Sequence, residues 1–378
     1  MKKYEHPLHW PNVLFLTLSP LAAIAGAAYY IPRYGVRPSE IIGFVLMFFA
    51  TGLSITGGYH RHFAHVAYKA NPIVRFFYLI FGACAMQNSA LNWASDHRQH
   101  HRYTDTEQDP YNAGQGFWYS HIGWIFYQSR QEKQLTNVGD LQLDPLVRWQ
   151  HRYPVIIALV VGFGGPALIG GMMGRMFGMI LWAGLIRVVC VHHATFFINS
   201  LAHMWGRQPY SRKDTSKDSW WLALITNGEG YHNFHHMFPS DYRNGIQWFQ
   251  WDPTKWLIRG LSFAGMTHKL HRVPPQLILR ARMEVEALDA EKRLQSMSLE
   301  LESSWRTKMA AAKERFEHDL AAWATTRARY WELKKAAWAN SEGAKHWKEK
   351  LAAYEARLDE ARLQWRAALQ NLQKSPVL

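Results

Sequence analysis

Cysteine is scarce in this sequence, whose 378 residues include only Cys84 and Cys190. Both lie in apolar stretches, so we expect no disulfide framework, as in a reducing cytoplasm. Acidic residues are also few, 29 against 43 Lys and Arg, which gives a net charge of +14. Such a basic balance can indicate nucleic-acid binding, but the long apolar runs favour a membrane, and we expect no nucleic-acid partner. No small-residue cleavage site follows the first apolar run, so a cleavable signal peptide is not expected.

Four apolar runs each approach the ~20 residues that a helix needs to cross a bilayer. They are residues 12–31, 41–58, 154–174 and 177–200. Residues 73–86 are shorter and contain Arg75, so we expect an interfacial or core helix there. Lys and Arg concentrate before the first run and between the second and third, whereas the two other short loops carry only Arg33, Arg37 and Arg175. The positive-inside rule then predicts four spans with both termini on the cytoplasmic side.

The composition changes near residue 276, which predicts two domains, residues 1–275 and 276–378. The second is rich in Ala, Glu, Lys, Arg, Leu and Trp, as long helices and coiled coils are. Apolar residues alternate by four and three from Met283 to Phe316 with one phase shift, and again from Trp347 to Leu372. The pattern predicts two helices, folded as an antiparallel hairpin, with residues 340–343 as a breaker. We expect the tryptophans to pack in the seam and the tail to self-associate or dock.

Three histidine clusters carry the chemistry. Residues 97–101 and 232–236 share the spacing H-x-x-H-H, and residues 60–65 carry three further histidines. Positions i, i+3 and i+4 of a helix lie on one face, so each H-x-x-H-H motif points three imidazoles the same way. Imidazole suits iron, zinc and copper, and eight such ligands exceed what one four-coordinate zinc uses. The sequence therefore predicts a site for two metal ions, on the cytoplasmic side with the clusters.

The other histidines divide into weaker candidates and structural residues. His60 and His65 are about 140° apart on a helix, so they reach different metals or lie where the second span frays. His62 lies off the face of both and is interpreted as incidental or as a partner of a ligand. Asn199 and His203, four residues apart at the end of the fourth run, can complete the site. We expect His192 and His193 to be structural.

At this point the sequence resembles the membrane fatty acyl desaturases of the stearoyl-CoA desaturase type. The resemblance runs from the first span to Lys255 and rests on ordered motifs with their flanks: residues 58–65, 93–101, 109–112, 116–124, 194–200 and 228–236. It implies an all-α membrane protein with four transmembrane helices and a cytosolic helical cap that holds a histidine-rich di-iron site. The tail lies outside the resemblance, so its role stays open.

The resemblance also implies a set of site residues. Nine histidines would bind two irons and Asn199 would bind through water: His60, His65, His97, His100, His101, His203, His232, His235 and His236. Residues along the acyl path would be Gln87, Asn88, Trp93, Asp96, Thr195 and Phe196, the last replacing the family's usual Trp. Carboxylates near the clusters would orient the imidazoles through hydrogen bonds: Asp96, Asp105, Asp109 and Glu229.

The implied reaction is an O2-dependent insertion of a cis double bond, most often at the delta-9 position, into a saturated acyl chain. A C–H bond of an alkyl chain has no acidic proton, so acid-base chemistry cannot cut it and a redox metal is needed, which excludes zinc. No heme or flavin domain is apparent, so electrons would come from a separate ferredoxin, rubredoxin-like protein or cytochrome b5.

The acyl carrier and the reaction type stay open at this stage. Basic residues that bind the coenzyme A head in the animal enzymes are replaced here by Ser95, Gln128 and Ser129, with Arg130 one step on. A lipid-linked or carrier-protein acyl chain therefore competes with acyl-CoA. A related di-iron hydroxylase is the alternative enzyme. A membrane metal-binding or transport protein is the non-enzymatic alternative, although transporters usually place their ligands within the spans.

Overall fold

The computed structural model describes all residues except 1–6, 128–134, 296, 298, 336–341 and 376–378. The chain divides into two compact units, Met1–Val273 and Pro274–Leu378. The regular secondary structure of each unit's described part is almost entirely helical, and the one sheet there pairs β1 (Lys69–Ala70) with β2 (Thr267–His268) in antiparallel register. The all-α fold expected from the sequence is confirmed.

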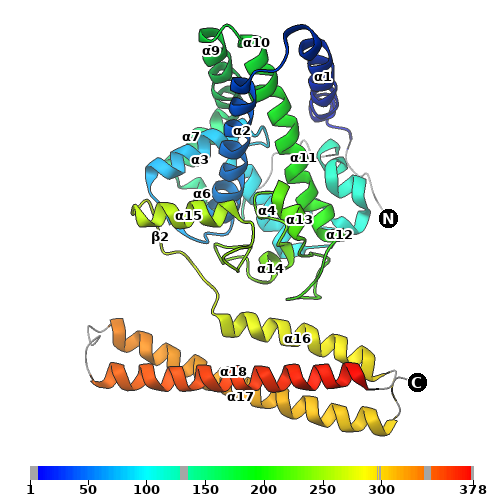
Figure 1. The fold of residues 1–378 in the computed structure, drawn as a ribbon. Helices are drawn as coiled ribbons and strands as arrows, with labels where there is room; N and C mark the ends of the chain where they lie inside the picture. Colours follow the sequence, from blue (N-terminus) through cyan, green and yellow to red (C-terminus); the bar gives the residue numbers. More distant parts are fainter. Residues whose placement is uncertain (1–6, 128–134, 296, 298, 336–341, 376–378) are drawn as a thin grey trace. The chain divides into compact units, whose positions relative to one another are not determined.

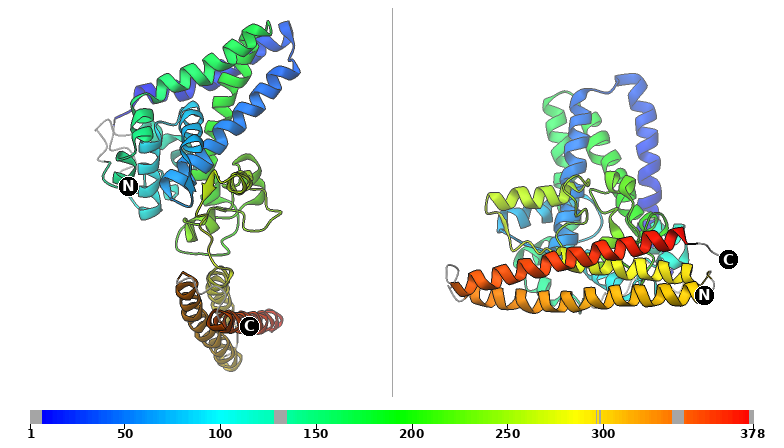
Figure 2. Two further views of the ribbon diagram at one scale, coloured as in Figure 1. Left: turned by 90° about the vertical axis from the view of Figure 1, so that its left-hand side faces the viewer. Right: turned by 60° about the horizontal axis from the view of Figure 1, so that its bottom comes forward.

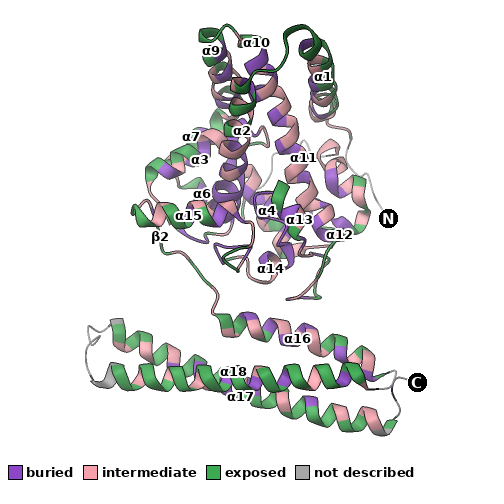
Figure 3. Cartoon of the chain, in the orientation of Figure 1, coloured by how far each residue is buried: buried purple, intermediate pink, exposed green. Residues whose placement is uncertain are grey.

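Four helices of the first unit are long and apolar enough to cross a membrane, and they contain the four predicted runs almost completely. They form a bundle in which most of each apolar surface faces outward (Figures 1 and 3). Outward-facing leucine and isoleucine suit lipid rather than water. The segments are α1 (Trp10–Tyr34), α2 with η1 (Pro38–Leu53, Ser54–Ala64), α8, η4 and α9 (Pro154–Leu159, Val160–Gly164, Gly165–Met172), and α10, η5, α11 and α12 (Met176–Met179, Ile180–Ile186, Arg187–Asn199, Leu201–Met204).

A buried carboxylate ties the two hairpin turns of this bundle together. Glu40, in the first turn of α2, accepts hydrogen bonds from the Tyr30 hydroxyl and from Arg175 Nε, both at 2.8 Å. Arg175, in the turn between α9 and α10, also donates to the carbonyls of Tyr34 and Gly35. These turns lie at the end of the bundle opposite α14 (His232–Met237) (Figure 1). The network fixes the spacing of the four helices at that end.

Shorter helices gather around the other end of the bundle (Figure 1). They are α3 (Pro72–Cys84), α4 (Ala90–Tyr103), η2 (Ala113–Gln115), η3 (Tyr119–Gly123), α5 (Trp124–Phe126), α6 (Gly139–Gln142), α7 (Pro145–Arg152), α13 (Trp220–Ile225), α14 and α15 (Pro253–Phe263). Their shared core includes Tyr59, Tyr68, Leu79 and Ile258, all buried. As expected, α3 is too short to span a bilayer; Asn71 caps its N-terminus by accepting from Val74 N.

The tail forms three helices, α16 (Pro275–Leu294), α17 (Leu299–Lys335) and α18 (Glu342–Lys374), which run side by side (Figure 2). The prediction of two helices is therefore wrong, because the chain also breaks between Leu294 and Leu299. The helices share a core in which Phe316 and Trp365 are each 1% exposed. Most of the seam positions read from the sequence line this core. Trp305, Trp323 and Trp365 pack in or against it, as expected, whereas Trp331 is 45% exposed. Part of the predicted breaker, residues 340 and 341, lies outside the described residues.

Candidate metal centre

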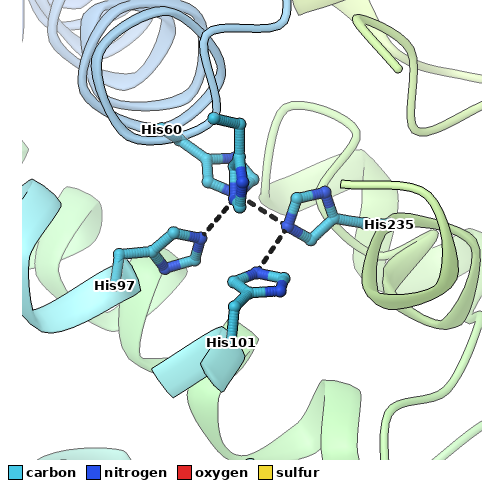
Figure 4. Close-up of side chains that lie close together, drawn as sticks. His60, His97, His101 and His235 are labelled. Atoms are coloured by element: carbon cyan, nitrogen blue, oxygen red, sulfur yellow. Dashed lines mark hydrogen bonds between the residues drawn. The ribbon is translucent and has the colours of Figure 1, made fainter. Parts of the chain in front are cut away.

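Nine histidines of the first unit form two compact groups. His60, His65, His97, His101 and His235 make the first, and His100, His203, His232 and His236 make the second. Within each group the ligand nitrogens all lie within 4.8 Å of one another. Figure 4 shows four imidazoles of the first group, from three different segments, converging on one point. The structure thus brings together all nine histidines that the resemblance implies.

Each H-x-x-H-H motif supplies both groups. On α4, His97 and His101 belong to the first group and His100 to the second. On α14 the assignment is reversed: His235 belongs to the first group, and His232 and His236 to the second. Residues four apart lie nearly above one another on a helix, whereas the third histidine is turned to the side. Because each motif contributes to both groups, the two groups lie next to each other.

The imidazoles face one another through their Nε2 atoms. In the first group Nε2 of His235 lies 2.9 Å from Nε2 of both His60 and His101, and His65 Nε2 lies 2.8 Å from that of His97. The second group forms a chain of Nε2 contacts, from His100 to His236 (3.3 Å), from His236 to His232 (3.1 Å), and from His232 to His203 (3.2 Å).

Hydrogen bonds on the outer side fix several rings in one tautomer. His60 Nδ1 lies 3.0 Å from Glu229, and His100 Nδ1 lies 2.9 Å from Asp109. A carboxylate can only accept, so both Nδ1 atoms carry the proton and both Nε2 atoms present lone pairs. Figure 4 shows His60 turned inward accordingly.

His203 is held in the same way through a hydroxyl. Thr215 Oγ1 donates to Asp105 Oδ1 at 2.9 Å, and therefore accepts from His203 Nδ1, also at 2.9 Å. The Nε2 of His203 consequently points a lone pair into the second group.

Protons alone cannot satisfy the second group. His100 and His203 offer lone pairs to His236 and His232, which also face each other. A neutral imidazole has one N–H, so at least one of the three contacts opposes two lone pairs or two N–H groups. A cation among the Nε2 atoms removes this conflict, because every imidazole can then turn a lone pair toward it. The residues present thus fit metal ions.

Burial keeps six of these imidazoles neutral. Their pKa values are lowered well below the usual value, first by burial and then by nearby imidazoles. The six residues are His65, His97, His101, His232, His235 and His236. Neutral imidazole is the form that binds a metal. Burial opposes ionisation of Glu229, but His60 and Arg61 outweigh it and lower the pKa of that carboxyl. Glu229 thus stays an acceptor for His60.

A cavity of about 400 Å³, within the usual size range of ligand pockets, adjoins the first group through His97. Its wall includes all six predicted substrate residues and Asn199, together with apolar side chains from α1, α3, α8 and α11. Three polar side chains of the cavity wall are joined by hydrogen bonds. Trp93 Nε1 donates to Gln87 Oε1 at 3.4 Å, and Gln87 Nε2 donates to Thr195 Oγ1 at 2.9 Å. Asn88 adopts φ of +75°, a left-handed conformation that bends the loop before α4.

Other predicted residues fall outside the two groups. His62 lies apart, with Nδ1 3.1 Å from the carbonyl oxygen of Tyr68. His192 lines the cavity, whereas His193 pairs with His121 at 3.1 Å. Ser95 donates to Asn137 Oδ1 at 2.7 Å, which occupies its hydroxyl. Residues 128–130, where the basic residues that bind coenzyme A in the animal enzymes are replaced, lie outside the described residues.

Three residues that support the imidazoles were missed in the sequence. Tyr111 has its hydroxyl 3.1 Å from His97 Nδ1, Asp214 lies 3.6 Å from His236 Nδ1, and Thr215 bridges His203 to Asp105. Tyr111 belongs to a motif already singled out, two residues after Asp109, and could have been found there. Asp214 and Thr215 lie in a loop without periodicity, and only the fold brings them to the site.

Comparison with known proteins agrees with this geometry. The fatty acid desaturase family matches residues 39–268, which include all nine histidines. The chain belongs to the fatty acid desaturase family. Among its relatives are "Probable acyl-CoA desaturase" of Schizosaccharomyces pombe, 41% identical over 72% of this chain, and "Acyl-CoA desaturase 1" of Saccharomyces cerevisiae, 39% identical over 78%. "Acyl-CoA Delta-9 desaturase" of Acheta domesticus is 33% identical over 73% of this chain.

The extent of the match differs among these desaturases. The chain spans 57% and 58% of the lengths of the two yeast proteins, and 79% of the Acheta protein. The family match ends at residue 268, so α16, α17 and α18 lie beyond it.

Proposed function

We propose that this desaturase-family protein inserts a cis double bond into a saturated fatty acyl chain, using O2 and two iron ions. The observation that carries the proposal is the convergence of nine inward-facing imidazoles in two adjoining groups beside a largely apolar cavity. The names of the three relatives support the acyl chain as substrate and coenzyme A as its carrier.

The proposed ligands of one iron are His60, His65, His97, His101 and His235, and those of the other are His100, His203, His232 and His236, with Asn199 acting through water. Iron is favoured over zinc because removal of hydrogen from an unactivated methylene requires redox chemistry. When bound, the iron pair would pass electrons to O2 and so activate it to remove hydrogen from the methylene groups. The balanced reaction converts –CH2–CH2–, O2, two electrons and two protons into –CH=CH– and two water molecules.

The residues of the chain supply position and exclude water. Glu229, Asp109 and the Thr215–Asp105 pair hold the inward tautomers of their histidines. We propose that the hydrogen-bonded side chains Trp93, Gln87 and Thr195, together with the left-handed Asn88, bend the cavity next to His97. A bent cavity would admit the acyl chain in one register and so select the carbon pair that reacts, most simply the delta-9 pair. Buried Phe196 closes the wall against water.

The orientation and the electron donor are part of the same proposal. We propose that the histidine groups and both termini face the cytoplasm, which the distribution of Lys and Arg around the spans supports. Electrons would arrive from a separate ferredoxin, rubredoxin-like protein or cytochrome b5. The net charge of +14 would attract an acidic donor to this face.

Expression in a desaturase-deficient yeast followed by fatty-acid profiling tests the activity. The expected result is growth without added unsaturated fatty acid, with products two hydrogens lighter than the saturated chain. Products heavier by one oxygen would instead identify a hydroxylase. Assays of membranes with acyl-CoA and with acyl lipids separate the two carriers. Iron-loaded purified protein that yields neither product, although it receives electrons, would refute the proposal.

A further inference from the structure

The end of α3 meets α11 through two polar side chains inside the bundle. Ala85 is the residue that follows α3, and its carbonyl lies beyond the last helical hydrogen bond, where acceptors need an outside donor. His192 Nε2 lies 2.8 Å from this carbonyl oxygen. Since a carbonyl can only accept, the Nε2 of His192 carries the proton and donates it. Arg187, five residues earlier on α11, donates to the neighbouring carbonyl of Cys84.

The loop that starts at Ala85 forms part of the cavity wall, through Met86, Gln87 and Asn88. Met86 and Asn88 have φ of +54° and +75°, left-handed values that cost energy in residues other than glycine. Such a backbone persists only where its surroundings hold it. Two residues of α11, one turn apart, hold this loop: His192 binds the Ala85 carbonyl, and Thr195 binds Gln87.

The His192 ring is also part of the wall. Its side chain is 3% exposed and lines the cavity together with Thr195, Phe196 and Asn199, which follow it along the same helix. It stacks on Phe196 with ring centres 5.6 Å apart, and Phe15 of α1 meets its edge at 5.7 Å. From His192 to Asn199 the helix rises about 10 Å. His192 thus lies deeper along the cavity than the Gln87–Thr195 bond.

We propose that His192 is a positioning residue that sets which carbon pair of the acyl chain is presented for reaction. By donating to the Ala85 carbonyl it keeps the left-handed loop in one conformation, and by stacking on Phe196 it fixes the neighbouring wall residue on α11. The inference rests on the proposed desaturase function. His192 touches neither histidine group, so the metal ions do not depend on it.

His192→Leu in the full-length protein tests the proposal, because leucine keeps an apolar volume but cannot donate. The readout is the positional distribution of double bonds, measured by mass spectrometry after derivatisation. We expect the share of minor positional isomers to rise on the order of fivefold, the factor that one ordinary hydrogen bond supplies. Iron content should match the wild-type protein. His192→Gln, whose amide can donate to Ala85, should keep most of the wild-type distribution.

The neighbouring histidine is the matched control. His193 is half-buried and pairs with His121; it meets the edge of the Phe196 ring at 6.0 Å between centres but does not line the cavity or bind the Ala85 loop, so His193→Leu should leave the product distribution nearly unchanged. If His192→Leu fails to fold, His192→Asn decides the question, because its shorter amide cannot reach Ala85 and should broaden the distribution where His192→Gln does not. If an iron-loaded variant that lacks the hydrogen-bond donor, His192→Leu or His192→Asn, gives the wild-type distribution of double-bond positions, the proposal is wrong. Absence of unsaturated product from the wild-type enzyme would instead refute the desaturase function.

Discussion

Glu229 connects His60 of the first histidine group to the buried Arg61, and Glu229→Gln tests the importance of these contacts. Its side chain is almost fully buried. One oxygen accepts from Arg61 Nη2 at 2.9 Å, and the other accepts from His60 Nδ1 at 3.0 Å and from Asn244 Nδ2 at 2.7 Å. Glutamine keeps the shape but offers one oxygen and one NH2 group. In either orientation the NH2 group meets donors, so one side of the network is broken.

The magnitude follows from the burial of both ions. Arg61 is 1% exposed and would keep only Asp252 as an acidic partner among the described residues. Loss of one partner of a buried ion pair costs about 3–5 kcal/mol. At roughly 2 °C per kcal/mol for a unit of this size, the unfolding midpoint should fall by about 6–10 °C. Loss of the carboxylate that orients His60 should also weaken metal binding by about 10–100-fold.

Thermal unfolding in detergent and iron analysis of the purified variant measure both effects. Asp140→Asn is the control, because the Asp140 side chain is 51% exposed and Arg98 keeps its hydrogen bonds to three carbonyls, so this variant should lower the midpoint less than Glu229→Gln does. The pH dependence has a definite sign. The pKa of Glu229 is lowered in the folded protein, so its contribution is complete above the unfolded value of 4.5 and is lost as the pH falls through the folded value. Wild-type iron content and midpoint in Glu229→Gln would refute this reasoning.

The remaining predictions use simpler readouts. His97→Ala and His235→Ala should each lose activity together with iron, whereas His62→Ala should keep substantial activity; complete loss in His62→Ala contradicts the ligand assignment. Glu40→Ala leaves Arg175 without its buried carboxylate and should lower the unfolding midpoint by several degrees with iron content unchanged, because the Glu40–Arg175 network lies at the end of the bundle opposite α14 (Figure 1). Loss of iron from Glu40→Ala would contradict this. Truncation after Val273 should leave activity intact because the tail has its own core; if the oligomeric state is also unchanged, tail self-association is wrong.

Periodicity and apolar length predicted much of this fold. The four membrane-length helices needed only composition, since a bilayer leaves few other solutions for 20 apolar residues. The spacing H-x-x-H-H gave three imidazoles on one face of α4 and of α14. The extra break between α16 and α17 was missed because no glycine or proline marks it; the nearest signal is the change of heptad phase after Leu301.

The division of the histidines between two groups is a property that no single segment carries. Spacing alone suggests that the three imidazoles of one motif serve one metal. The structure instead splits each motif, because α4 and α14 each turn their middle histidine, His100 or His235, toward the outer pair of the other helix. One helix alone can build neither group, and a shift of either disturbs both. Metal ions bound at the two groups would therefore be coupled through the packing of these helices, and the residues that fix that packing belong to the site as much as the imidazoles do.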